Sequence, residues 1–180
     1  MVARAQGLND SSDFSFQGIS GELKYRVLNP NSDPVGLALY FEPTYSGQAT
    51  ELEYKLIVSK YIGENWLLAA NVTMEQEWTR EQGVSKTESV LEYTFGVAYR
   101  FTPNWSAGIE ARRHTVYEGS SFNTQAGSAW FLGPNIHYGT AGWWATFTAL
   151  PQISGYPGDG RLDLTEHQRL EARIIIGVNF

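Results

Sequence analysis

Apolar and polar residues alternate one by one along most of this chain. Between Leu91 and Phe101, every odd-numbered residue is apolar or aromatic, while the even-numbered residues include Glu92 and Arg100. Successive side chains of a β-strand point to opposite faces, so this period predicts strands with one apolar and one polar face. We expect about nine of them, at residues 15–28, 35–46, 50–62, 65–79, 88–102, 105–118, 128–139, 142–154 and 166–180.

The connections between these strands fall into two length classes that alternate along the chain. NPNSDP, GEN, TPN and TAG are short, whereas REQGVSKTE, EGSSFNTQAGS and GYPGDGRLDLTEH are longer, and YSGQAT is a short member of the second class. Tight turns at one end and longer loops at the other are typical of outer-membrane barrels. The fold class predicted is therefore all-β, an antiparallel up-and-down transmembrane β-barrel.

Aromatic residues gather at both ends of the predicted strands. Three short turns lead directly into a tryptophan, at Trp66, Trp105 and Trp143. Such rings favour the boundary between lipid and water, because they are apolar in body and polar at one edge. The alternative is a soluble barrel in which they cap an apolar core that binds an apolar ligand. Aromatic residues at the opposite strand ends favour the membrane: Tyr45, Trp78, Tyr117 and Trp130.

The polar face mixes charges of both signs with small residues such as Gly96, Ala98 and Gly108. Small residues suit a crowded concave interior better than a solvated convex surface. We therefore expect the polar face to line a barrel lumen, with charges that pair across it. The candidate lumen-lining residues are Glu22, Lys24, Arg26, Glu42, Glu53, Lys55, Glu75, Glu92, Arg100, Glu110, Arg112, His114, His137, Glu171 and Arg173.

Five residues break the simple pattern. Lys60 and Arg113 lie on the apolar parity near strand ends, where a long side chain can extend its charge to the interface. Pro43, Pro134 and Pro151 fall inside predicted strands, and each removes a hydrogen-bond donor. Each proline therefore predicts a bulge or an unpaired site in the sheet.

Composition narrows the classes of function. The chain has 180 residues, a formal net charge of −6 and no cysteine. The negative charge argues against nucleic-acid binding, and the absence of cysteine excludes disulfides and thiolate metal sites. No run of about 18 apolar residues exists, so no membrane-spanning helix is expected. We expect no cofactor.

The C-terminus carries a pattern of its own. Ile174, Ile176, Val178 and the final Phe180 share one parity. This arrangement resembles the sorting signal of Gram-negative outer-membrane barrels, which the barrel-assembly machinery reads. The resemblance implies two partners, the lipid bilayer of the bacterial outer membrane and that machinery.

Several stretches resemble an uncharacterised family of proteobacterial outer-membrane proteins, known only as a domain of unknown function. They are YRVLNPNSDPVGLALYFEPTY, LLAANVT, YRFTPNWSAGIEAR, FLGPNIHY and WWAT, and the resemblance runs from about residue 13 to the end. Members of that family are longer. We therefore expect residues 1–12 to be a disordered or remnant segment, and residues 13–180 to be an N-terminally truncated part of a barrel with roughly 10–12 strands.

Five functions remain open from the sequence, the fifth being cation binding by the last long loop. The first is a porin-like pore or transporter for small polar solutes, and its nearest rival is a structural barrel plugged by its own salt bridges. A soluble barrel is the third. An outer-membrane hydrolase is the fourth, but His114 has no convincing serine partner, so we expect no enzyme. In the last long loop, Asp159, Asp163, Glu166 and His167 offer cation ligands without any recognised spacing.

Overall fold

The computed structural model describes residues 18–179 except 82 and 158–161, so the expectations for residues 1–12, the start of the first strand and Phe180 lie outside it. The described part forms one ten-stranded sheet and contains no helix. The strands are β1 (Ile19–Ser20), β2 (Leu23–Leu28), β3 (Gly36–Tyr45), β4 (Ala49–Ile62), β5 (Trp66–Glu81), β6 (Val84–Arg100), β7 (Trp105–Glu118), β8 (Thr124–Gly139), β9 (Trp143–Tyr156) and β10 (Leu170–Val178).

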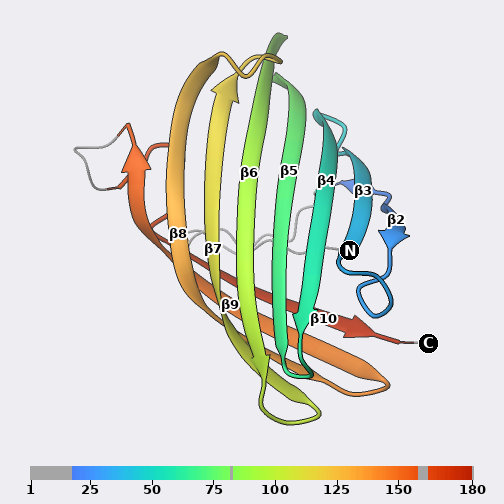
Figure 1. Cartoon of the computed structure of the whole chain (residues 1–180). Helices are drawn as coiled ribbons and strands as arrows, with labels where there is room; N and C mark the ends of the chain where they lie inside the picture. Colours follow the sequence, from blue (N-terminus) through green and yellow to red (C-terminus); the bar gives the residue numbers. More distant parts are fainter. Residues whose placement is uncertain (1–17, 82, 158–161, 180) are drawn as a thin grey trace.

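Each strand pairs antiparallel with the next along the chain. The exception is at the start, where β1 and β2 both pair with β3 and together form the predicted first strand. The sheet curls strongly, so that β9 and β10 pass behind the central strands in Figure 1. Within the described residues, β10 and the β1–β2 edge have no strand beyond them. The predicted all-β, up-and-down barrel architecture is confirmed as a strongly curled half-barrel.

Three strands begin at the tryptophans that the sequence singled out, namely Trp66, Trp105 and Trp143. The prediction of long loops was wrong in two places. β5 and β6 continue to Glu81 and Val84, which leaves only residues 82 and 83 between them, and β7 and β8 are joined by residues 119–123. Gly83, with φ of 85°, permits the turn between β5 and β6, and Gly119, with φ of 77°, begins the connection between β7 and β8. Only the connection at 157–169 stays long.

The three strand prolines lie where the ladder is interrupted, as predicted. Pro43 lies opposite the break between β1, which pairs up to Ser20, and β2, which begins at Leu23. Pro134 and Pro151 both fall in the gap between the β8–β9 pairs Phe131–Gln152 and Asn135–Thr148. A residue that cannot donate is tolerated at such positions because no partner strand requires its N–H.

In a soluble barrel the apolar face of the sheet is buried and the polar face is exposed. In this sheet the apolar face is the more exposed one. Leu39, Phe95 and Ile109, all on the apolar face, are about half exposed at 49%, 50% and 55%. Thr73 and Arg112, on the polar face, are 4% and 9% exposed. The described apolar core is a small cluster on the polar face: Ala129, Phe131 and Leu150.

Candidate functional site

Ion pairs on the polar face join strands that are not neighbours in the sheet. Arg112 on β7 donates to Glu171 on β10 at 2.6 Å, and Arg173 on β10 donates to Glu110 on β7 at 2.5 Å. Because β8 and β9 separate these strands, the side chains can meet only across the concave side. The polar face is therefore concave, and the apolar face is convex.

Arg112 is the centre of this network. Its Nε lies 3.4 Å from Glu92 Oε2, an ion pair without a hydrogen bond, and its guanidinium lies 5.0 Å from the ring centre of Phe131. Thr94 donates to Glu92 at 3.0 Å. Arginine suits such a position because its planar group can contact two carboxylates and an aromatic face at once.

Residues 162–169, which we call the inner segment, fold against the concave side of β7, β8 and β9. The Gln152 amide holds this segment, because it donates to the carbonyls of Asp163 and Gln168 and accepts from the Asp163 N–H at 2.7 Å. An added Cβ at Gly127 would lie 2.4 Å from Asp163 Oδ2, and one at Gly155 would lie 2.2 Å from Asp163 N. Glycines therefore allow the inner segment to approach the sheet.

A chain of hydrogen bonds continues from the inner segment to β7. Asp163 Oδ2 lies 2.9 Å from His167 Nδ1, and His167 Nε2 lies 2.9 Å from His114 Nδ1. Asp163 is fully buried, and its other oxygen accepts the backbone N–H groups of Thr165 and Glu166. Buried polar groups need hydrogen-bond partners, so this series of hydrogen bonds holds the inner segment in place.

The β3–β7 side of the concave face carries rows of glutamates opposite one another. Lys55 pairs with Glu53 at 2.7 Å, and Lys86 pairs with Glu88 at 2.8 Å. Carboxylates directly opposite each other repel, so the rows of glutamates destabilise the sheet unless solvent or bound cations reduce the repulsion. Among the described residues, no group of acidic and histidine side chains has the geometry to hold a metal ion. The rows are Glu42, Glu53 and Glu75, then Glu51, Glu77, Glu88 and Glu118.

The other predicted lumen residues lie apart from the Arg112 network. Lys24 and Arg26 on β2 are opposite Tyr40 and Ala38, and Glu22 lies in the break between β1 and β2. His137 lies 2.8 Å from the Thr146 hydroxyl. Arg100 donates to the carbonyl of Glu64 at the β4–β5 turn.

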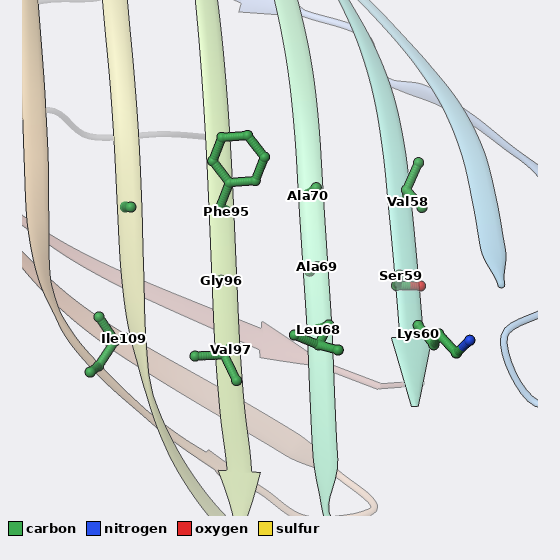
Figure 2. Close-up of a pocket in the computed structure, with 11 residues that line it drawn as sticks. Val58, Ser59, Lys60, Leu68, Ala69, Ala70, Phe95, Gly96, Val97 and Ile109 are labelled. Atoms are coloured by element: carbon green, nitrogen blue, oxygen red, sulfur yellow. The ribbon is translucent and has the colours of Figure 1, made fainter. Parts of the chain in front are cut away.

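The convex face is apolar and is hollowed along its centre. A groove of about 420 Å³ crosses β4 to β7 on this face. Figure 2 shows Leu68 and Ala70 on β5, Phe95 and Val97 on β6, and Ile109 on β7 along it, with Lys60 on β4 at its border. At the strand ends by the short turns, aromatic rings pair across strands, with centroids 4.9 Å apart for Trp66–Tyr99 and 4.7 Å for Trp105–Tyr138. On β10, the predicted assembly residues Ile174, Ile176 and Val178 are exposed at 70%, 66% and 59%.

Sequence reasoning did not identify Gln152 or Phe131 as part of the polar network. It weighed Asp163 and His167 only as cation ligands, whereas the two bind each other. Their spacing of four residues in a loop carries no signal for that contact. The small residues Gly127 and Gly155 opposite them offered the available hint.

The strands described above lie within the part of the chain that matches a known family. Residues 6–180 match the Family of unknown function (DUF6662). The chain belongs to this family. Comparisons of the DUF6662 chain with curated proteins and with solved structures gave no significant match. The predicted resemblance to a family of unknown function is confirmed, while its proteobacterial and outer-membrane character stays a prediction.

No helix in the described part of the DUF6662 chain is long and apolar enough to cross a membrane. The expectation that the chain is not an enzyme also stays a prediction.

Proposed function

We propose that this DUF6662 chain is an outer-membrane β-barrel protein whose convex face contacts lipid. One observation carries the proposal: large apolar side chains are exposed on the convex face, while charged side chains are paired on the concave face. Water on the convex side would solvate Leu39, Phe95 and Ile109 at about 25 cal/mol per Å2 of apolar surface, and hydrocarbon removes that cost.

Closure of the sheet is part of the proposal. In hydrocarbon every backbone N–H and C=O must be paired, so β10 and the β1–β2 strand, which form the two edges of the described sheet, need partners. These two edge strands run in the same direction, because an even number of antiparallel steps separates them. An odd number of further strands would close a fully antiparallel barrel. The barrel-assembly machinery, reading β10, is the proposed partner in membrane insertion.

Gel mobility and cell fractionation test the location. The barrel should sediment with the outer membrane and should migrate faster on a detergent gel without heating than after boiling. A soluble barrel that binds an apolar ligand would remain in solution without detergent and would reject the proposal. A variant with Ser85, in the β5–β6 hairpin, replaced by Ala serves as a neutral control for folding and export.

A second candidate function is the passage of small polar solutes through the interior. The carboxylate rows on β3–β7 favour it, because rings of acidic side chains are typical of cation pathways. The inner segment and the Arg112 network lie on the same concave face and narrow the path. Purified protein in planar bilayers should then give small, cation-selective current steps. Folded protein that gives no current steps would instead establish the plugged structural barrel.

A further inference from the structure

Arg113 is an arginine on the apolar convex face. It lies on β7 directly opposite Tyr93 on β6 and Trp130 on β8, and both neighbours are aromatic. Its guanidinium lies 5.9 Å from the Trp130 ring centre, and its Nε is buried without a hydrogen-bond partner. Within the described residues, Arg113 has no carboxylate partner, in contrast to Arg112 beside it. Near a strand end such a charge can be met by interfacial water or by an anion from outside the chain.

Neutral donors surround this arginine. An open pocket of about 660 Å³ is lined by Arg113 together with Asn123, Thr124, Gln125, Ser128 and Tyr156. Gln125 donates to the Ser128 hydroxyl at 3.3 Å, which orients two of these groups. One cation with amides and hydroxyls, and with no acidic side chain among the described lining residues, is complementary to an oxyanion. The planar fork of arginine fits phosphate best, because it can donate two parallel hydrogen bonds.

The pocket lies at the strand ends near the β7–β8 hairpin, where Tyr117 and Phe122 stack edge to face at 5.4 Å. The apolar groove of Figure 2 begins beside it. Ala111, which lines the groove, is two residues from Arg113 on the same face of β7, a separation of about 7 Å. The charged pocket and the apolar groove are therefore neighbours on the convex face.

We propose that Arg113 and this groove bind a membrane lipid, with the lipid phosphate at Arg113 and an acyl chain in the groove beside Ala111, Phe95 and Ala70. The proposal rests on the outer-membrane location proposed above. The proposal assigns one bound lipid to this groove, whereas the rest of the convex face would contact lipids without selecting one. The phosphate matches the cationic pocket, and the acyl chain matches a groove whose lining is apolar except at its β4 border, where Ser59 and Lys60 lie.

Native mass spectrometry of the detergent-solubilised full chain, titrated with diphosphoryl lipid A, tests the proposal. Replacing Arg113 by Gln should weaken binding about tenfold, and Arg113→Lys should weaken it less, because a point charge replaces the fork. Arg80→Gln is the matched control, because Arg80 is an exposed arginine on the same face near the tip of the β5–β6 hairpin. It should leave binding unchanged.

The remaining arms separate the sources of phosphate and the two proposals. Millimolar inorganic phosphate should not displace the lipid, and phosphate-free diacylglycerol should bind far more weakly than lipid A. Equal affinity of wild type and Arg113→Gln, or full displacement by inorganic phosphate, overturns the lipid site. If the protein is heat-modifiable and fractionates with the outer membrane but binds no lipid A, only the lipid site fails. A chain soluble without detergent fails both.

Discussion

Arg112 on β7 binds Glu92 on the adjacent strand and Glu171 on β10, with β8 and β9 between β7 and β10. This contact closes a polar bridge across the concavity of the sheet. The bridge sets the curvature of the sheet between β7 and β10, because a flatter sheet would move the Arg112 guanidinium away from the Glu171 carboxylate.

Replacing Arg112 by Met should destabilise the folded chain by about 3 kcal/mol, since it leaves two partly buried carboxylates unpaired. Chemical unfolding in detergent micelles, followed by tryptophan fluorescence, measures this. Adding Glu171→Gln to Arg112→Met should restore part of the loss. Strict additivity of the two single changes would show that the bridge contributes no coupling.

Gln152 should control how firmly the inner segment is held. Its replacement by Leu removes three hydrogen bonds at a buried position, with an expected cost of about 2–3 kcal/mol. Trypsin should then cleave after Arg169 faster than in the wild type. Gln48→Leu, at an exposed amide between β3 and β4, is the control, and cleavage that is equally slow in both variants would contradict the clamp.

Gly133 should tolerate no side chain. A Cβ there would lie 1.8 Å from the Ala149 carbonyl oxygen, a backbone atom that cannot move without breaking the sheet. We expect Gly133→Ala to destabilise the chain by about 3 kcal/mol or to block folding. Gly142→Ala meets nothing within 4 Å and should change stability little. A similar midpoint of unfolding for the two variants would show that β8 and β9 are not so close at this point.

A substitution at Phe95 tests whether lipid or water contacts the convex face. Arginine at the centre of a lipid-facing strand costs about 2–4 kcal/mol, whereas on a solvated surface it is neutral. Phe95→Arg should therefore lower both the stability in lipid vesicles and the amount of protein in the outer membrane. Val84→Arg, at the hairpin end and 70% exposed, should have no such effect. Unchanged stability of Phe95→Arg would place water at this face.

The strands and their two faces were predictable because alternation is a local property: each residue's face follows from its parity. The prolines at 43, 134 and 151 also predicted ladder interruptions correctly, since a missing donor is a property of one residue. The loop lengths were predicted less well. Polar residues such as Ser85 and Lys86 resemble loop in composition, yet cross-strand pairing with Arg80 and Thr79 keeps them in a hairpin.

The odd or even position of a residue along its strand was enough to assign Arg112, Arg113 and Glu171 to the polar or the apolar face. This assignment is local, because it requires no knowledge of residues elsewhere in the chain. Position along the strand did not assign their partners. Arg112 and Glu171 are 59 residues apart and meet through the curl of four strands. Arg113, one residue along, is turned to the opposite side, where it lies over the Trp130 ring and meets no carboxylate of the described residues. That difference arises from the curvature of the whole sheet, which brings concave side chains together and spreads convex ones apart.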